Sequence, residues 1–411
     1  MDKASEHFVH VDGRKVFYRR YGSGPAVVFL HGSPQSSRAV KPLIDAVGGG
    51  FTCIAVDTPG NGLSDPLPLV EPNAPDYADA FAKFLDALGL GRVALYGFHT
   101  GAGTAMEFLR RHPGRATCLV ADGYAVWTDE ERDYLLRDYL PPFDLKPDGA
   151  HLANLWSRME EQTVFFPWFE RTARGRMVYD VPSPQHIHAN AMDVLNAGDN
   201  FRPPYASAFR RRGAEGLHEI QDAAVLIAAA ANDPLAPHLD RLPTDLPPNF
   251  TIEKTDGDRA AALARFYEHL KAHPGDPPPA PPKAGANSDG VTHEVVKREA
   301  GGLHWSGSLG ASGRPLVLLH QAGGSKRLFE PTLSKIATTR PVLAFDLPGH
   351  GDSTSIDPPS SVSDYTDAIA LALSDLGVRD ADICGHHLGG QIAAELGARG
   401  LAQSVGLIGA P

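Results

Sequence analysis

The stretch from Val93 to Gly103 constrains the fold more than any other part of the chain. Four apolar residues lead into Gly97 and Gly101, which stand two positions either side of His99, and a helical pattern follows from Thr104. A strand that turns directly into a helix strains the residue at the turn, which is tolerated when its neighbours have almost no side chain. The sequence therefore predicts a strand, a sharp turn and a helix, with the His99 side chain projecting above a sheet.

Apolar segments typical of buried strands alternate with helical segments through the first part of the chain. We expect strands at 26–30, 51–56, 93–96, 116–122, 223–229 and 250–254, and a hairpin over 8–19 that turns at Asp12-Gly13. This alternation predicts an α/β protein with a mostly parallel, doubly wound sheet covered on both faces. The aromatic-rich, helical segment 128–212 interrupts it, and we expect an inserted cap there.

Three motifs occur twice, at nearly constant spacing. His31-Gly32-Ser33, Asp57-Thr58-Pro59-Gly60 and the turn around His99 recur as His320-Gln321-Ala322, Asp346-Leu347-Pro348-Gly349 and Gly385-His386-His387-Leu388-Gly389, at offsets of 289, 289 and 288 residues. Such regularity indicates a tandem duplication. We expect one domain at 1–273, a Pro/Gly-rich linker at 274–290 that is neither helix nor sheet, and a second domain at 291–411.

The second copy is expected to be incomplete. Its last residues, up to Pro411, correspond to the first copy near Asp122, so it has no counterpart of the cap or of the last two strands. An apolar parallel edge left in this way tends to pair with another chain. We therefore expect either a natural chain that continues past 411, cover from the first unit, or a homo-oligomer formed through the incomplete second domain.

Composition bears on location and partners. A formal charge of −11 disfavours nucleic acid and anionic membranes as partners, and no segment approaches the ~20 apolar residues of a membrane span. The first eleven residues do not have the pattern of a secretory signal, so we expect a cytoplasmic protein. The three cysteines are interpreted as buried thiols, and His186 and His188, which have no third ligand at suitable spacing, as cap surface. We expect no metal and no cofactor.

Taken in order, these motifs resemble those of the α/β-hydrolase superfamily, in which serine normally stands where this chain has His99. His31-Gly32-Ser33-Pro34 is most similar to the haloalkane dehalogenase and epoxide hydrolase branch. The resemblance implies that the backbone N–H groups of Ser33 and Thr100 bind an oxyanion and that His31 anchors its loop.

The same resemblance places the orienting acid after the seventh strand, at Asp233. Asp122 occupies the alternative position for this acid, but we interpret it as a solvated loop residue. The family's catalytic histidine follows the last strand, but residues 255–259 contain none, and His269 and His273 are expected to be solvent-exposed. A Ser-His-Asp triad therefore cannot be assembled from matching positions.

Histidine at the turn suggests a different use of the fold. Neutral imidazole is a good general base near neutral pH and can act as a nucleophile. We expect an enzyme in which Asp233 or Asp258 orients His99 as base or nucleophile, acting on a small apolar ester or carbonyl substrate by hydrolysis or by cofactor-free lyase or proton-transfer chemistry. The alternative is a non-catalytic binding or scaffold protein that has lost the triad. His387 marks the corresponding turn in the second copy.

Overall fold

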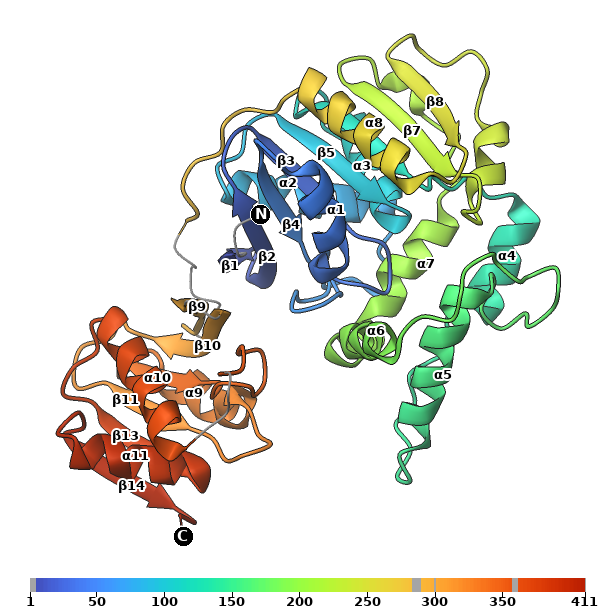
Figure 1. The fold of residues 1–411 in the computed structure, drawn as a ribbon. Helices are drawn as coiled ribbons and strands as arrows, with labels where there is room; N and C mark the ends of the chain where they lie inside the picture. The colour runs from blue at the N-terminus through green and yellow to red at the C-terminus, as the bar shows by residue number, and fades with distance from the viewer. Residues whose placement is uncertain (1–4, 283–289, 299–300, 357–360, 411) are drawn as a thin grey trace. The chain divides into compact units, whose positions relative to one another are not determined.

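A computed structural model of the 411-residue chain describes residues 5–282, 290–298, 301–356 and 361–410. The described residues form two compact units, one made by 16–282 and the other by 5–15 together with the residues from 290 onwards. Both units are shown in Figure 1. Among the described residues, no helix has both the length and the apolar character that crossing a bilayer requires.

The first sheet has eight strands in the order β1-β2-β4-β3-β5-β6-β7-β8. β2 runs antiparallel to β4, whereas the six strands β4, β3, β5, β6, β7 and β8 are parallel to one another. The turn before β2 has positive φ angles of 51° at Asp12 and 74° at Gly13, as expected for a two-residue hairpin turn. The strands are β1 (Ser5–Val11), β2 (Arg14–Gly22), β3 (Ala26–Leu30), β4 (Thr52–Val56), β5 (Val93–Phe98), β6 (Ala116–Asp122), β7 (Ala224–Ala230) and β8 (Phe250–Thr255).

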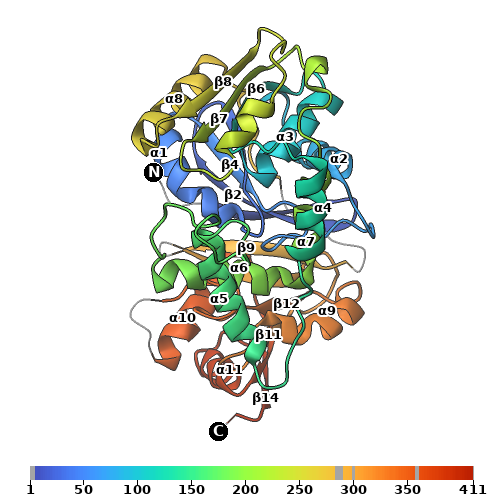
Figure 2. The same ribbon diagram turned by 90° about the vertical axis from the view of Figure 1, so that its right-hand side faces the viewer.

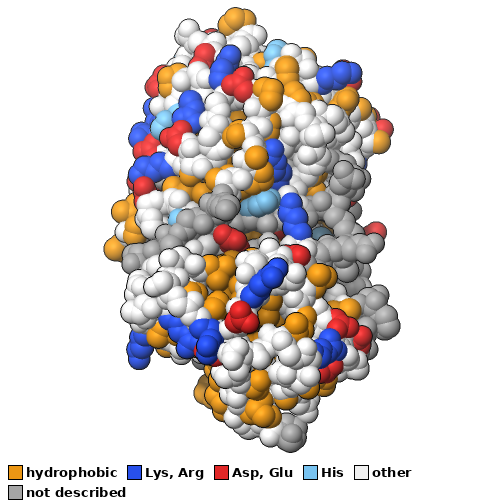
Figure 3. Space-filling model, turned by 90° about the vertical axis from the view of Figure 1, so that its left-hand side faces the viewer, with side chains coloured by type: hydrophobic (Ala, Val, Ile, Leu, Met, Phe, Trp, Pro, Cys, Tyr) orange, Lys and Arg blue, Asp and Glu red, His pale blue; other side chains and the backbone are white. Residues whose placement is uncertain are grey.

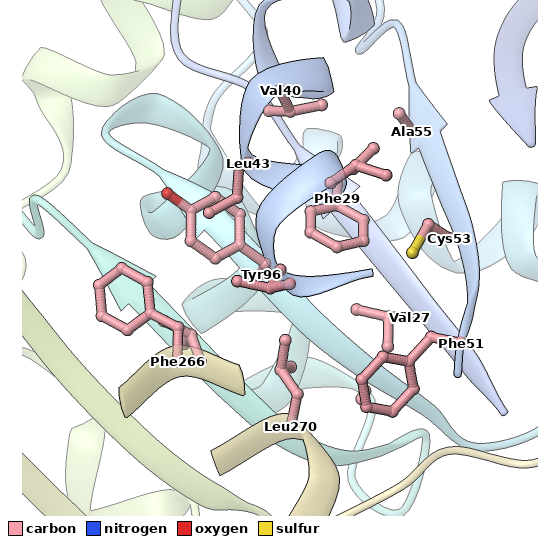
Figure 4. Close-up of a cluster of buried hydrophobic side chains, with 14 of the residues drawn as sticks. Val27, Phe29, Val40, Leu43, Phe51, Cys53, Ala55, Tyr96, Phe266 and Leu270 are labelled. Atoms are coloured by element: carbon pink, nitrogen blue, oxygen red, sulfur yellow. The ribbon is translucent and has the colours of Figure 1, made fainter. Parts of the chain in front are cut away.

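Helices cover both faces of this sheet, so the predicted fold class is confirmed. α1 (Lys41–Val47) and α8 (Arg259–Ala272) lie together on one face, and α2 (Ala74–Ala87) and α3 (Thr100–Arg111) lie together on the other. Figure 4 shows the core between the sheet and the helices α1 and α8, where Phe266 and Leu270 of α8 pack towards Phe29 and Tyr96 of the strands. Each large side chain buried in this way contributes about 1.5–3 kcal/mol, so the α8 contacts are a substantial part of the core.

Four helices are inserted between β6 and β7: α4 (Asp129–Asp138), α5 (Ala150–Val164), α6 (Pro184–Ala197) and α7 (Arg202–Arg210). They gather on one side of the first sheet (Figure 2). Their apolar faces share one hydrophobic cluster with Leu235, which follows β7: Trp127, Leu135, Tyr139, Leu155, Met159, Ile187, Val194, Phe201 and Phe209. Since Leu235 anchors this cluster beside Asp233, the insertion is packed onto the carboxyl ends of the strands.

The second unit contains a sheet that, from one edge to the other, has the order β9-β10-β12-β11-β13-β14. This is the order of the first six strands of the first sheet, β1-β2-β4-β3-β5-β6. Its helices are α9 (Glu330–Ile336), α10 (Val362–Asp375) and α11 (Leu388–Ala398). β14 lies at the sheet edge, with Leu407 and Ile408 about half exposed. The strands are β9 (Thr292–Arg298), β10 (Gly301–Ser308), β11 (Leu316–Leu319), β12 (Val342–Phe345), β13 (Asp382–His386) and β14 (Ser404–Ile408).

Short 3-10 helices complete the described structure: η1 (Ser37–Val40), η2 (Gly198–Phe201), η3 (Leu217–Glu219), η4 (Ala236–Arg241) and η5 (Lys326–Phe329). On the face shown in Figure 3, acidic and basic side chains of the described residues are interspersed with apolar ones rather than separated into fields of one sign.

The compact units differ from the predicted boundaries at both ends of the first domain. Residues 5–15 group with the second unit. Residues 274–282 are neither helix nor strand, but they are fastened to the first unit, because Asp276 bonds the backbone of Ala26 and Arg92. The following part of the expected linker, 283–289, lies outside the described residues.

Candidate functional site

The turn after β5 has the strained geometry that its glycines predict. His99 has φ 47° and ψ −108°, and α3 begins at the next residue. A Cβ atom at Gly97 would lie 2.6 Å from the amide nitrogen of Ala102, and one at Gly101 would lie 2.3 Å from the carbonyl oxygen of Leu30. Neither position can carry a side chain without moving the backbone, so β5 and α3 can meet only through this sharp turn.

The side chain at the turn is bonded to a carboxylate. The Nε2 atom of His99 lies 2.9 Å from Oδ2 of Asp233, which follows β7. The other oxygen, Oδ1, accepts a hydrogen bond of 2.7 Å from the backbone N–H of Leu235, which fixes the orientation of the carboxylate. The Asp233 side chain is 10% exposed and that of His99 is 31% exposed, so the pair lies at the floor of an accessible site.

Of the two acids considered for His99, the structure brings Asp233 to it and gives Asp258 another partner. Asp258 is the N-cap of α8, where its Oδ1 accepts hydrogen bonds from the backbone of Ala260 at 2.9 Å and Ala261 at 3.2 Å. A carboxylate in this position stabilises the start of a helix. Asp258 therefore caps the helix, and among the described residues the carboxylate bonded to the imidazole is that of Asp233.

Burial and charge act in opposite directions on the pair. Burial lowers the pKa of His99, but the charge and hydrogen bond of Asp233 outweigh it, so the pKa lies above its ordinary value. Burial raises the pKa of Asp233, whereas the charge and hydrogen bond of His99 bring it below its ordinary value. Asp233 is thus an anion at neutral pH and favours protonation of the imidazole.

Two neighbours shape the space around the ring, and the sequence did not single out either. Phe98 stacks on it, with ring centroids 3.9 Å apart and an interplanar angle of 18°. Gly123, which follows β6 with φ 70°, leaves room for it: a Cβ there would lie 2.2 Å from Cδ2 of His99 and 2.6 Å from Nε2. The only sequence signal for this role is a glycine directly after a strand end.

The expected oxyanion donors lie beside His99. Thr100 is the first residue of α3, and the backbone N–H of Ser33 points to its hydroxyl oxygen at 3.4 Å. A hydrogen bond of this length is weak, so a substrate oxygen can replace it. Buried His31 anchors the loop as expected, because its Nδ1 lies 2.9 Å from the carbonyl of Gly32 and its Nε2 accepts from the backbone of Thr58 at 3.1 Å.

A cavity of about 330 Å³ opens above these groups. Gly32, Ser33, Phe98, His99, Thr100 and Asp233 form its floor. The inserted helices and the segments flanking them supply mostly aromatic and sulfur-containing side chains: Trp127, Tyr139, Met159, Phe166, Met177, Tyr179, Tyr205 and Phe209. A site of this size and lining suits a small ligand that is largely apolar.

Two sequence interpretations near the site are wrong. Asp122 is buried rather than solvated, and its Oδ2 accepts a hydrogen bond of 2.6 Å from the hydroxyl of Tyr96. His269 is also buried, and its Nε2 lies 3.2 Å from the carbonyl oxygen of Ala224. Burial raises the pKa of Asp122 and lowers that of His269 to about 4. Both residues are buried where α8 packs against β6 and β7, a contact that the local sequence does not reveal.

The histidines of α6 do not form a metal site with other described residues. His186 and His188 lie near the start of this helix, and His186 also lines the cavity. Among the described residues, no three histidine, cysteine or acidic side chains are grouped as metal ligands would be. Cys53, Cys118 and Cys384 are free thiols, the first two of them buried.

The second unit repeats the turn without the carboxylate. His387 has φ 49° and ψ −110°, nearly the angles of His99, and Gly409 follows β14 as Gly123 follows β6. In the described part of the second unit, no acidic side chain bonds His387. The two turns therefore share their backbone but differ in the surroundings of the imidazole.

Comparison with known proteins agrees with this architecture. The family model for the alpha/beta hydrolase fold matches residues 25–258 and 314–405. A 2-(acetamidomethylene)succinate hydrolase from Mesorhizobium japonicum is 34% identical over 134 residues, which are 32% of this chain and 48% of that protein. A putative non-heme haloperoxidase from Mycobacterium phage D29 is 33% identical over 116 residues, 28% of this chain and 41% of that protein. The chain thus spans about half the length, or less, of these curated relatives.

Solved structures share the fold at low sequence identity. A bromoperoxidase from Bacillus anthracis superimposes with a TM-score of 0.50 and 19% identity, covering 66% of this chain and 99% of its own. Epoxide hydrolase A from Mycobacterium thermoresistibile gives a TM-score of 0.51 and 16% identity, with 67% and 100% coverage. At such identities the likeness concerns the fold alone, so the chemistry must be argued from the site.

Proposed function

Because the chain belongs to the alpha/beta hydrolase fold family, we propose that its first unit is an enzyme for small, largely apolar esters or carbonyl compounds. His99 is its general base, and Asp233 is the acid that orients it. The observation that carries this proposal is the 2.9 Å bond between Nε2 of His99 and Asp233, within the floor of the cavity. The four inserted helices act as its cap.

This bond supports different roles for the two nitrogens of His99. A carboxylate accepts a hydrogen bond, so Nε2 carries the proton in the neutral ring and Nδ1 carries the lone pair. No described residue forms a hydrogen bond with Nδ1, which is therefore available to a ligand. An imidazole held in one tautomer by an anion is well suited to remove a proton near neutral pH.

For an ester, the proposed reaction is base-catalysed hydrolysis. Nδ1 of His99 removes a proton from water as the water oxygen attacks the carbonyl carbon. The carbonyl oxygen becomes negatively charged and accepts hydrogen bonds from the backbone N–H groups of Ser33 and Thr100. The imidazolium, stabilised by Asp233, then protonates the leaving oxygen as the carbon–oxygen bond breaks, which yields the acid and the alcohol.

The same base can serve two related reactions. If Nδ1 attacks the carbonyl itself, an acyl-imidazole forms and is hydrolysed by water, and a burst of alcohol release distinguishes this route. If the substrate has an acidic C–H bond beside a carbonyl, His99 removes that proton and the same amides stabilise the enolate. Both routes need the 2.9 Å pair.

The test is turnover of a panel of aryl esters and activated carbonyl compounds by wild type and His99→Ala. Loss of a general base should lower kcat/KM by about 10²- to 10⁴-fold. His387→Ala is the matched control, because it removes the same side chain from the same strained turn in the other unit. Equal rates in wild type and His99→Ala would exclude His99 from the mechanism.

A non-catalytic binding protein is the second candidate. It is favoured by the absence of a hydroxyl side chain at position 99 and of a histidine in the loop between β8 and α8. Under this alternative, cavity ligands raise the unfolding temperature but none is converted, and His99→Ala changes affinity without changing any rate.

A further inference from the structure

Arg211 brings a positive charge to the cavity, directly after α7. Its guanidinium is held by neutral oxygens: the Tyr124 hydroxyl accepts from one terminal nitrogen, and the carbonyl of Ala125 accepts from the other at 3.2 Å. The Tyr124 hydroxyl in turn donates to the carbonyl of Gly213 at 2.7 Å, and the guanidinium lies 4.4 Å from the centre of the Tyr124 ring. The cation is therefore fixed in place without being neutralised.

No carboxylate of the described residues forms an ion pair with Arg211, whereas three neighbouring arginines each form an ion pair with an acid. Arg110 pairs with Glu107 at 2.6 Å, Arg210 with Glu71 at 3.7 Å and Arg212 with Asp129 at 3.2 Å. Among the cavity-lining residues the single acid, Asp233, is already bonded to His99. A half-buried guanidinium with unused N–H groups is a binding site for an anion.

We propose that Arg211 binds a carboxylate of the ligand, so that the substrate is a small ester or carbonyl compound that also carries one carboxylate on an apolar body. A guanidinium binds a carboxylate through two parallel N–H donors, which no neutral group of the same shape can match. The inference deepens the proposed function, on which it rests, because it names the class of substrate and fixes its orientation.

The position of Arg211 relative to His99 sets the orientation. A Cβ at Gly103 would lie 3.0 Å from Nε of Arg211, so the guanidinium rests against the first turn of α3. Gly103 donates its N–H to the carbonyl of His99 at 3.1 Å and stands one turn beyond it, about 6 Å along the helix axis. The carboxylate of a bound substrate therefore lies about one helical turn from the carbonyl group that faces His99.

Arg211 also lines a second, polar pocket, whose other charged residues are Arg110, Arg210, Arg212, Glu107, Glu215 and Glu219. An anion bound there would contact the same side chain from outside the cavity. The two sites are distinguishable because Trp127 lines the aromatic cavity and is not among the residues of the polar pocket.

The test compares 3-phenylpropionate with 3-phenylpropionamide, its neutral analogue, on the full chain. We expect wild type to bind the carboxylate about 10- to 100-fold more tightly by calorimetry, with a change in tryptophan fluorescence that Trp127→Phe removes. Arg211→Gln should abolish this preference while the amide still binds, and Arg211→Lys should keep part of it. Unchanged amide binding serves as the folding control.

Two further variants separate the possible failures. Gly103→Ala keeps the cation but presses a methyl group against it, so it should weaken carboxylate binding more than amide binding. His99→Ala should keep the preference even if the proposed catalysis is wrong. Equal affinities in wild type, a preference that survives Arg211→Gln, or carboxylate binding that leaves Trp127 unaffected would each overturn the inference.

Discussion

Replacing Gly123 with alanine tests whether the backbone after β6 determines where the His99 ring lies. The new Cβ would be 2.2 Å from Cδ2 and 2.6 Å from Nε2 of the ring, closer than any two such atoms can approach. A small shift of the ring cannot relieve this clash, because Phe98 stacks on the ring with the centroids 3.9 Å apart and Asp233, in the loop after β7, bonds its Nε2. We expect the imidazole to rotate away and lose the Asp233 bond.

The expected destabilisation has two parts. Alanine at the observed φ of 70° costs about 1–2 kcal/mol relative to glycine. Loss of a hydrogen bond to a charged group adds about 1.5–3 kcal/mol, so Gly123→Ala should destabilise the first unit by about 2.5–5 kcal/mol in total. In a His99→Ala background no ring is present to displace, and only the first part should remain. The coupling energy between the two positions is therefore about 1.5–3 kcal/mol.

The assay is a double-mutant cycle on the 411-residue protein, followed by denaturant unfolding. Tryptophan fluorescence reports mainly on the first unit, which contains three of the four tryptophans: Trp127, Trp156 and Trp168. Titration of the His99 ring by NMR gives an independent reading, since its pKa should fall towards the ordinary value when the Asp233 bond is lost. A coupling energy near zero, with an unchanged ring pKa, would refute the reasoning.

Two further predictions concern the acids around His99. Asp233→Asn should lower activity by about 10²-fold or more. Asp122→Asn should have a smaller effect, because Asp233 bonds the imidazole whereas Asp122 bonds Tyr96. Steady-state kinetics that show the reverse order would move the orienting role to Asp122. The base must be unprotonated to act, and the pKa of His99 is raised above the ordinary histidine value of ~6.5. Activity should therefore rise with pH, with a midpoint above that ordinary value. In Asp233→Asn this rise should occur at lower pH, because the charge that raises the pKa is gone. A pH–rate profile that is identical in the two proteins would contradict this assignment.

The sequence determined the features that depend on neighbouring residues. Gly97 and Gly101 sit where any side chain would strike the backbone, so their spacing alone predicts the strained turn at His99. The repeated motifs likewise predicted a second sheet, and its strand order matches the first six strands of the first sheet. These inferences succeeded because backbone sterics and strand periodicity act over a few residues.

The partner of His99 was beyond local rules. Asp233 and Asp258 both follow strands that end on the same edge of the sheet, and the sequence left both open. The choice depends on the path of each loop: Asp258 turns back to cap α8, whereas Leu235 fixes Asp233 towards the imidazole. The burial of Asp122 and His269 was missed for a similar reason, since it depends on where α8 lies across the sheet.

Arg211 shows the limit most clearly. It lies 112 positions after His99 in the chain, and its sequence neighbourhood, Arg210-Arg211-Arg212, reads as an ordinary charged surface. Arg210 and Arg212 do pair with surface acids, while Arg211 turns inwards onto Tyr124 and the cavity. Local sequence determined the turn that presents the imidazole. Only the tertiary structure decided that Asp233 bonds this imidazole and that Arg211 lines the same cavity, because both contacts join segments distant along the chain.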